Sequence, residues 1–328
     1  MPALSVILST PDCFETIRAT ASCVSQQSIA DQIELVIVCP DAAALALDAG
    51  GCGALHSVQV VEFGGALSSV GNANALGVLK AHAPVVALAE DHCFPQSGWA
   101  VALLARHSGQ WAAVGPVFIN ANPENGVSDA DLLMAYGPFM QGCGDGPVPF
   151  LPGHNSSYKR ETLLKFGAQL PELMSAEYNL HQELRSSGEG LYCEPAAVVA
   201  HTNFSRWQPF LGATFLSARH FAGCRGGDWS LLKRLLYVAA SPLIPLVRLR
   251  RIAMEAMRAR LPLPRLVACT PALFTGLVAS ALGEAAGYTV GCLNSDSRLV
   301  YYEFHRYRHT LSGRPVAEAV PTLLVNAN

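Results

Sequence analysis

Through the first 120 residues, short apolar runs alternate with longer stretches in which apolar residues recur at helical spacing. Short runs rich in β-branched residues are typical of buried strands, whereas apolar positions three or four residues apart are typical of helices. The pattern predicts strands at 4–8, 33–38, 58–63, 85–88 and 111–118, and helices at 14–27, 70–81 and 99–107. Strands that alternate with helices predict an α/β fold with a mostly parallel, doubly wound sheet and flanking helices.

Polar side chains follow three of these strands at the point where each strand ends. They are Thr10 and Asp12, then Asp41, then the triplet Glu90, Asp91 and His92. Ligands of parallel α/β sheets bind at the carboxyl ends of the strands, so we expect a binding site at this edge. A single aspartate after a strand is also typical of a helix cap or a turn, and that alternative stays open for each aspartate taken alone.

The region after the last predicted strand differs in composition. Residues 120–152 are rich in Gly, Pro and Asn and end in GCGDGPVPFLPG. This composition predicts a long loop region over the active face of the sheet, and loops of that length are usually functional or mobile.

The C-terminal part changes character from about residue 231. Residues 235–247 and 266–283 carry no charge over 13 and 18 residues, and between them lies the basic segment RLRRIAMEAMRAR. The longer run only just reaches the length of a membrane span. Two interpretations stay open: a buried helical hairpin, or interfacial or shallow insertion into a membrane whose anionic headgroups attract the arginines.

Charge is distributed unevenly along the 328 residues. Residues 1–205 hold 7 basic and 19 acidic side chains, residues 206–265 hold 11 and 2, and residues 266–328 hold 4 and 4. An acidic first part excludes general nucleic-acid binding, which depends on lysines and arginines that neutralise phosphates. With 51% hydrophobic and 14% charged residues, most of the chain is also too apolar to be disordered.

The ten cysteines form no CxxC pair and no zinc-finger spacing, so we expect buried free thiols in a reducing compartment. The first residues carry no basic segment ahead of a signal-type apolar run, so we expect the N-terminal part to face the cytoplasm. Together these features predict an α/β domain at 1–230 and a C-terminal apolar and basic helical region at 231–328 that associates with the cytoplasmic face of the cell membrane.

Five separated motifs in order, covering about residues 4–225, resemble the glycosyltransferases of family 2. The motifs are LSVILSTPDCFETIRATASCVSQQ, IELVIVCPD, GNANALGVLKAHAPVVALAEDHCFPQSGW, LPGHNSSYKRETLLKFG and SAEYNLHQELRSSGEGLYCEPAAVVAH. The resemblance implies a GT-A fold, which is a Rossmann-like, mostly parallel sheet. It also implies a nucleotide-sugar donor.

The resemblance implies a role for several residues. Asp41 stands where the family contacts the nucleotide base, Asn74 lies on the helix of the third motif, and Gly153 and Asn155 lie under the donor sugar. Glu90, Asp91 and His92 fall on the family's acidic metal-binding motif, where this chain has EDH in place of D-x-D. With His201, which follows the last strand, they would hold a divalent cation, and His92 shifts the preference from Mg²⁺ towards Mn²⁺.

The fifth motif implies the catalytic residue. Counting back from Gly188 places Glu177 at the family's catalytic carboxylate, although its usual acidic neighbour is Ala176 here. Glu177 would be the general base that takes the proton of the acceptor hydroxyl. A carboxylate at the start of a helix is also stabilised by the helix dipole, which is the structural alternative.

The sequence therefore predicts a membrane-associated, inverting glycosyltransferase. It would move a sugar from a nucleoside-diphosphate sugar to the hydroxyl of a glycan or lipid-linked acceptor of the cell envelope. Two alternatives stay open: a sugar-nucleotide nucleotidyltransferase, although no Gly-rich phosphate loop follows the first strand, and a degenerate GT-A protein that binds sugars without turnover.

Overall fold

The computed structural model describes residues 1–48 and 52–313, which form two compact units. The first unit contains residues 1–119 and 144–201, and the second contains residues 120–143 and 202–313. The boundary expected near residue 230 lies inside the second unit, in which the helix at 207–225 packs with the C-terminal helices.

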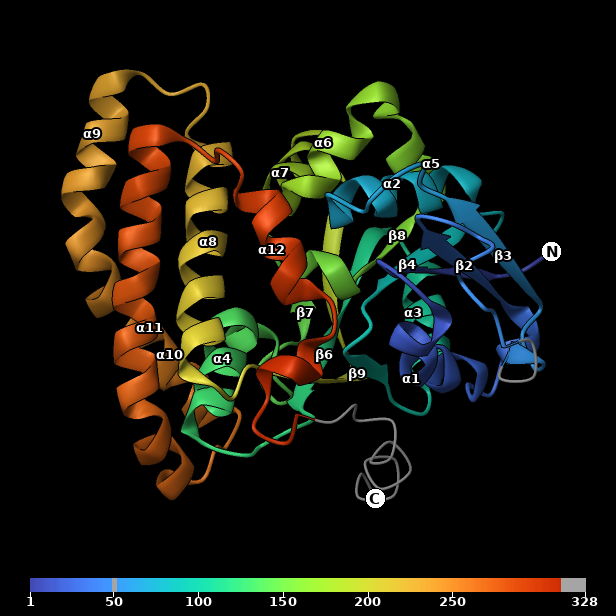
Figure 1. Ribbon diagram of the computed structural model, residues 1–328, viewed down its shortest axis with the longest axis horizontal. Helices are drawn as coiled ribbons and strands as arrows, with labels where there is room; N and C mark the ends of the chain where they lie inside the picture. The colour runs from blue at the N-terminus through green and yellow to red at the C-terminus, as the bar shows by residue number, and fades with distance from the viewer. Residues whose placement is uncertain (49–51, 314–328) are drawn as a thin grey trace. The chain divides into compact units, whose positions relative to one another are not determined.

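The first unit is built on one mixed sheet with the strand order β3-β2-β1-β4-β8-β6-β9-β5, and β7 pairs with β9 (Figure 1). Its strands are β1 (Leu4–Ser9), β2 (Ile33–Cys39), β3 (Ser57–Glu62), β4 (Val85–Ala89), β5 (Cys93–Pro95), β6 (Trp111–Asn120), β7 (Gly146–Pro147), β8 (Ser157–Lys159) and β9 (Gly190–His201). The strands from β1 to β4 are parallel, as predicted, whereas β8 runs antiparallel to both β4 and β6, and β9 is antiparallel to β5 and β7. The α/β architecture is confirmed, and its parallel part is the N-terminal half of the sheet.

Helices cover both faces of this sheet. They are α1 (Phe14–Ser25), α2 (Val70–Lys80), α3 (Trp99–His107), α5 (Arg160–Leu164), α6 (Leu170–Ser175) and α7 (Glu177–Ser186), with short 3₁₀ helices η1 (Ala30–Gln32), η4 (Gly153–Asn155) and η5 (Gly167–Gln169). The crossovers through α1 and α2 run in opposite directions along the sheet, so right-handed connections place the two helices on opposite faces (Figure 1). Every residue of β1 and β2 is buried between them.

The second unit is helical. Its elements are α4 (Gly126–Tyr136), η3 (Gly137–Phe139), α8 (Trp207–Arg225), α9 (Leu231–Ala240), η6 (Ser241–Leu243), α10 (Ile244–Arg258), α11 (Leu263–Val290), α12 (Ser295–Glu303) and η7 (Arg306–His309). The long helix α11 packs against α8 and α4 and buries Leu273 and Leu277 there. Among the described residues α11 is the one helix long and apolar enough to cross a membrane, judged by length and composition alone.

The prediction of a continuous loop over residues 120–152 is wrong, because α4 occupies residues 126–136. Asn125 begins this helix: its side-chain oxygen accepts hydrogen bonds from the backbone amides of Val127 (3.0 Å) and Ser128 (3.1 Å). Asn and Gly therefore mark a helix start here and not a loop. The helix is fixed from the same unit by Arg265, which donates to the Asp129 carboxylate (Nε to Oδ2, 2.9 Å).

Two buried histidines flank consecutive residues of β8. His107 Nε2 lies 2.9 Å from the Ser157 hydroxyl, and His181 Nε2 lies 3.0 Å from the Tyr158 hydroxyl. Burial lowers the pKa of each imidazole to about 4. Both rings are therefore neutral at pH 7 in the folded protein, and α3 and α7 are anchored to the middle of the sheet.

These histidines make the fold sensitive to acid. In the unfolded chain each ring takes up a proton near its ordinary pKa of about 6.5, whereas the folded rings resist protonation down to about pH 4. The contribution of His107 and His181 to the free energy of unfolding should be fully present above pH 6.5. It should fall as the pH drops from 6.5 to 4, by about 3 kcal/mol per histidine. Urea unfolding at pH 7, 6 and 5 measures this. Equal free energies of unfolding at pH 7 and pH 5 would contradict the assignment. NMR ring signals of His107 and His181 that titrate near pH 6.5 would also contradict it.

Candidate functional site

The site lies at the carboxyl ends of the parallel strands in the first unit. Leu8 of β1 is paired with Ala89 of β4, so the chain leaves both strands at the same edge of the sheet. Thr10 follows β1 and Glu90 follows β4 at that edge. The end of β2 lies beside β1 and leads to Asp41. Three sets of polar residues predicted for this edge are therefore placed on it by the strand register.

The carboxylate of Glu90 is held from several sides. Its side chain is 9% exposed. Asn155 donates to Oε2 through its side-chain amide (2.6 Å), and the Cys93 thiol donates to the same oxygen (3.1 Å). The backbone carbonyl of Glu90 accepts a hydrogen bond from the Thr20 hydroxyl of α1 (2.8 Å), which fixes the turn that follows β4.

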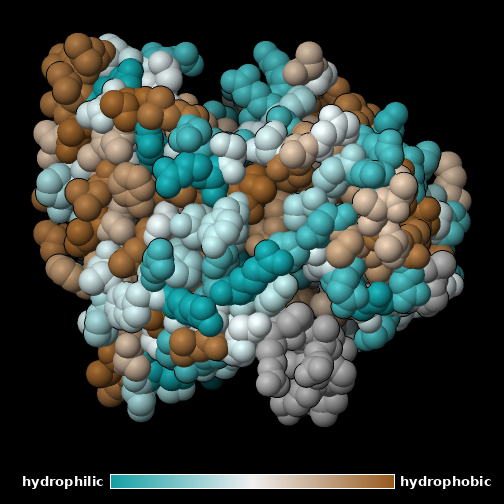
Figure 2. Space-filling view, in the orientation of Figure 1, coloured by the Kyte–Doolittle hydropathy of each residue, from teal (hydrophilic) through white to brown (hydrophobic). Residues whose placement is uncertain are grey.

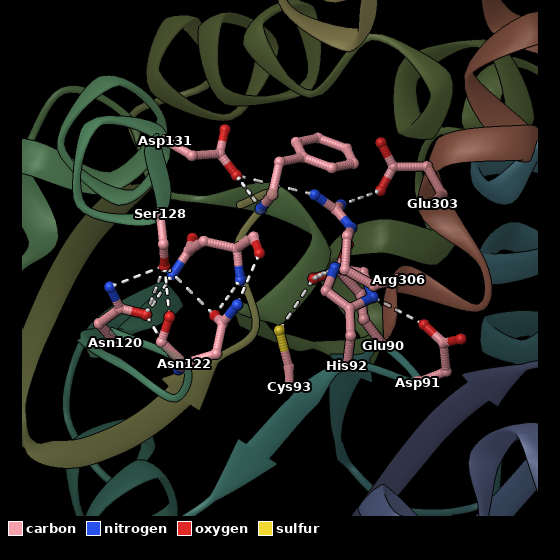
Figure 3. A network of polar contacts seen from close by, with 12 residues as sticks. Glu90, Asp91, His92, Cys93, Asn120, Asn122, Ser128, Asp131, Glu303 and Arg306 are labelled. Atoms are coloured by element: carbon pink, nitrogen blue, oxygen red, sulfur yellow. Dashed lines mark hydrogen bonds and ion pairs between the residues drawn. The ribbon is translucent and has the colours of Figure 1, made fainter. Parts of the chain in front are cut away.

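The imidazoles of His92 and His201 complete the group around Glu90, and Figure 3 shows His92 beside Glu90 and Asp91. His92 Nδ1 lies 2.6 Å from Asp91 Oδ1, and His92 Nε2 lies 3.7 Å from Glu90 Oε2. The His201 ring packs edge-on against the His92 ring, with their centroids 4.9 Å apart. His201 reaches this position because it is paired with Cys93 in the β5–β9 ladder.

The surroundings of Glu90 keep it ionised. Burial by itself would raise the pKa of this carboxyl group, but the imidazoles of His92, His154 and His201 and the hydrogen bond from the Cys93 thiol lower it further. The net effect holds the pKa of Glu90 below its ordinary value. At neutral pH the site therefore contains a buried anion surrounded by nitrogen atoms.

The same residues fit a divalent cation. Glu90, His92, Cys93 and His201 each present a ligand atom, and within the described ranges these four atoms lie within 4.8 Å of one another. His92 Nε2 is buried without a hydrogen-bond partner among the described residues, and a cation would satisfy it. The Cys93 thiol donates a hydrogen bond to Glu90 and is therefore protonated. The Glu90 carboxylate and the imidazoles of His92 and His201 are the better ligands. This donor set suits Mn²⁺ better than Mg²⁺.

Asp91 has a different position from its two neighbours in the triplet. Its carboxylate lies against Nδ1 of His92, which leaves Nε2 directed towards Glu90. A carboxylate on the far nitrogen of an imidazole fixes the ring orientation and raises its basicity as a ligand. The geometry therefore places Glu90 and His92 where they could hold a cation, and it places Asp91 where its carboxylate orients the His92 ring.

Glu177 is the first residue of α7. The 3₁₀ helix η4 contacts both Glu177 and Glu90. Its Oε1 lies 2.9 Å from Nε2 of His154, and its side chain is 25% exposed. The neighbouring residues of η4 are Gly153, where a Cβ atom would overlap the Glu177 carboxyl group, and Asn155, which donates to Glu90. The three residues of η4 thus contact both carboxylates.

The remaining predicted residues take mainly local hydrogen bonds. Asp12 accepts from the backbone amide of Cys13 (2.7 Å) and the hydroxyl of Thr16 (2.6 Å), which is the helix-start role weighed for it as an alternative. Thr10 is buried and donates to the carbonyl of Cys13 (2.9 Å). These contacts organise the turn between β1 and α1.

Asp41 and Asn74 differ in exposure. Asp41 is exposed and accepts from the amide of Ala43 (2.8 Å), as in a turn. Asn74 lies on α2 with 2% exposure, and its Oδ1 has no hydrogen-bond partner among the residues that the structure describes. The buried amide oxygen of Asn74 could therefore accept a hydrogen bond from a bound ligand.

Sequence reasoning missed two members of the site, His154 and Cys93. His154 stands next to Asn155 in the fourth motif, so its place in the motif was visible although its contact with Glu177 was not. Cys93 directly follows the EDH triplet, but the spacing of the ten cysteines led us to expect a buried free thiol there as at the others. A search for imidazoles and thiols adjacent to the assigned motif residues would have found both.

No protein-family model matches the chain, and no curated protein matches it. Similar solved structures include GalNAc-T7 with UDP, GalNAc and Mn²⁺, at 15% identity over 62% of this chain and 44% of that chain, with a TM-score of 0.46. A mannosyltransferase from Pyrobaculum calidifontis in complex with GDP-Man and Mn²⁺ is 14% identical over 99% of this chain and 87% of its own, with a TM-score of 0.46. TarS from S. aureus is 11% identical over 92% and 91%, also with a TM-score of 0.46. This chain spans less than half of the GalNAc-T7 chain, and all three TM-scores are below 0.5, so the functional conclusion rests on the site residues themselves.

Proposed function

We propose that the chain is an inverting glycosyltransferase of the GT-A type, a variant of family 2 with EDH in place of D-x-D. It transfers a sugar from a nucleoside-diphosphate sugar to the hydroxyl of a glycan or lipid-linked acceptor. The observation that carries the proposal is that η4 contacts both Glu90 and Glu177 at the carboxyl edge of the parallel strands. A cation-binding group and a separate, partly exposed carboxylate are the two components that this reaction needs.

The donor is proposed to bind along the carboxyl ends of β1, β2 and β4. Asp41 and Asn74 would contact the nucleoside, and Thr10 and Asp12 would shape the turn that receives it. A divalent cation held by Glu90, His92 and His201 would stabilise the negative charge that develops on the departing diphosphate. Gly153 and Asn155 would lie under the donor sugar, and the missing side chain of Gly153 leaves room for the Glu177 carboxyl group.

Glu177 is proposed to remove the proton from the acceptor hydroxyl as the oxygen attacks the anomeric carbon. The new glycosidic bond forms on the face opposite the diphosphate, the bond to the diphosphate breaks, and the configuration inverts in this single displacement. One carboxylate suffices because the leaving group needs no second acid. His154, 2.9 Å from Glu177, holds the carboxylate in place and can take part in passing the proton to solvent.

The first prediction concerns the cation and the donor. Purified protein incubated with a panel of sugar nucleotides should release nucleoside diphosphate in the presence of Mn²⁺ and lose this activity with a chelator. Glu90→Gln should weaken Mn²⁺ binding by at least tenfold, because it removes the anionic ligand, whereas Glu15→Gln, an exposed carboxylate on α1, should not.

Other outcomes of this assay identify the alternatives. Release of pyrophosphate from a nucleoside triphosphate and a sugar phosphate would favour a nucleotidyltransferase. Donor binding without any release in the presence of acceptors would favour a sugar-binding protein without turnover. Either result would contradict the proposed transferase.

The second prediction concerns the general base. Glu177→Gln should leave the dissociation constant of the donor nearly unchanged and lower kcat by roughly two to four orders of magnitude, since a positioned base contributes that much. Glu183→Gln, on the exposed face of the same helix, is the matched control and should retain activity. A proportional loss of donor affinity in Glu177→Gln, or unchanged kcat, would contradict the role of Glu177.

Membrane association is proposed from the second unit alone. No residue of α9 is buried, and Leu231 and Leu232 on this helix are each 70% exposed. On α10, Leu246 and Val247 are each 69% exposed. Figure 2 shows hydrophobic side chains gathered over α9 and α11 on the left of the view. Soluble monomers rarely expose apolar patches of this extent, so we propose that this surface enters the headgroup region of a bilayer.

Charge and burial indicate the kind of contact. Exposed basic residues interleave with the exposed leucines, namely Lys233, Arg250, Arg251 and Arg258. They suit the anionic cytoplasmic leaflet. In α11, 44% of the most apolar window is buried within the protein, and its Glu284 pairs with Arg248 (Oε1 to Nη2, 3.1 Å). We therefore propose interfacial attachment through α9, α10 and the exposed side of α11, whose other side packs inside the unit.

The third prediction tests this surface. The full chain should sediment with vesicles containing anionic phospholipid and bind weakly to purely zwitterionic vesicles. Leu232→Gln with Leu236→Gln should weaken vesicle binding about tenfold or more, because two exposed leucines lose their apolar contact. The control pair, Leu79→Gln with Val101→Gln, changes exposed apolar residues of the first unit and should bind normally. A full-length protein that stays in solution with anionic vesicles would contradict the proposal.

A further inference from the structure

A second cluster of metal-binding side chains lies in the helical unit, and the proposed transferase reaction does not use it. His220 and Cys224 are on α8, and Cys292 follows the end of α11. His220 Nε2 lies 3.6 Å from Cys224 Sγ, and Cys224 Sγ lies 3.2 Å from Cys292 Sγ. Within the described part of the chain, the three ligand atoms lie within 4.8 Å of one another.

The backbone, and not only the side chains, brings these groups together. His220 and Cys224 are four residues apart on α8 and therefore share one face of the helix. At Gly223, between them, a Cβ atom would overlap the backbone of Cys292, so only glycine allows the chain to approach this closely. Gly291 ends α11 with a positive φ of 78° and turns the chain so that Cys292 meets α8.

Further contacts hold Cys292 in this place. Arg219 donates through Nε to the carbonyl of Gly291 (3.2 Å), and the Cys292 thiol donates to the carbonyl of His220 (3.4 Å). The carbonyl of Cys292 accepts from the amide of Ser295 at the start of α12. The position of the third ligand is thus determined by the junction of three helices.

We propose that His220, Cys224 and Cys292 form a binding site for a thiophilic divalent metal ion, with Zn²⁺ as the best match. Two sulfur atoms and one imidazole are a donor set that Zn²⁺ prefers, and water can take the fourth tetrahedral position. Zn–S bonds of about 2.3 Å and Zn–N bonds of about 2.0 Å separate tetrahedral ligand atoms by about 3.5 to 3.8 Å. The nitrogen–sulfur distance of 3.6 Å fits this range, and the two sulfurs need to separate by about half an ångström from 3.2 Å.

The site is independent of the proposed transferase function. Binding would release the thiol protons and link α8 to the end of α11, two helices that pack along each other in this unit. The expected consequence is a metal-dependent stabilisation of the helical unit. The alternative chemistry, a disulfide between Cys224 and Cys292, requires an oxidant and shortens the sulfur–sulfur distance to about 2.05 Å; both thiols are free in the structure.

The test uses full-length protein kept reduced with a phosphine and titrated with Zn²⁺ against a chelating dye. Cys224→Ser and Cys292→Ser should each lose one equivalent of bound Zn²⁺ relative to the wild type. Cys143→Ser, a half-buried cysteine of the same unit outside the cluster, is the matched control and should retain it. Glu90→Gln should also retain this equivalent, which separates the cluster from the site at the sheet edge.

A measurement on the unmodified chain keeps the test decisive if a variant fails to fold. Zn²⁺ should slow the alkylation of Cys224 and Cys292 by iodoacetamide at least tenfold, as followed by mass spectrometry, and leave Cys143 unchanged. Equal alkylation rates with and without Zn²⁺, or undiminished Zn²⁺ binding by both serine variants, would overturn the proposal. Recovery of a Cys224–Cys292 disulfide from protein purified without added oxidant would also overturn it, in favour of a redox pair.

Discussion

The proposed chemistry depends on one short element, the 3₁₀ helix η4, and on its two polar side chains. Asn155 donates to the Glu90 carboxylate at 2.6 Å, and His154 lies 2.9 Å from the Glu177 carboxylate. By supplying a partner to each carboxylate from consecutive residues, η4 ties the positions of Glu90 and Glu177 to one short element of the first unit.

The rest of the first unit keeps this element in place. The parallel strands β1, β2 and β4 end at one edge and present Glu90 there, while the β5–β9 ladder brings His201 to the same group. Tyr158 of β8 contacts His181 of α7, and that helix begins with Glu177. Protonation of His181 at low pH would weaken its contact with Tyr158, which anchors the helix that carries Glu177. The stability of the fold and the geometry of the site are therefore linked.

The sequence pattern predicted the strands and helices of the first 120 residues closely, because buried β-branched runs and helical spacing are local properties. It failed at residues 126–136, where Asn125 begins a helix inside a segment rich in Gly, Pro and Asn. For the site, motif order named Glu90, His92, His201 and Glu177, but their relations depend on contacts between distant residues, such as His92 and His201, which are 109 positions apart. No spacing rule reports that Asp91 turns towards His92, or that Cys224 meets Cys292 from 68 positions away.

The most direct test of the central claim is a crystal structure of the full chain with Mn²⁺ and a nucleoside diphosphate, with the ion located by its anomalous scattering. The account predicts Mn²⁺ bound by Glu90, His92 and His201, with the diphosphate on the ion and the Glu177 carboxylate facing the space beside the diphosphate. An ion bound elsewhere would contradict it. A bound diphosphate that other side chains separate from the Glu177 carboxylate would also contradict it.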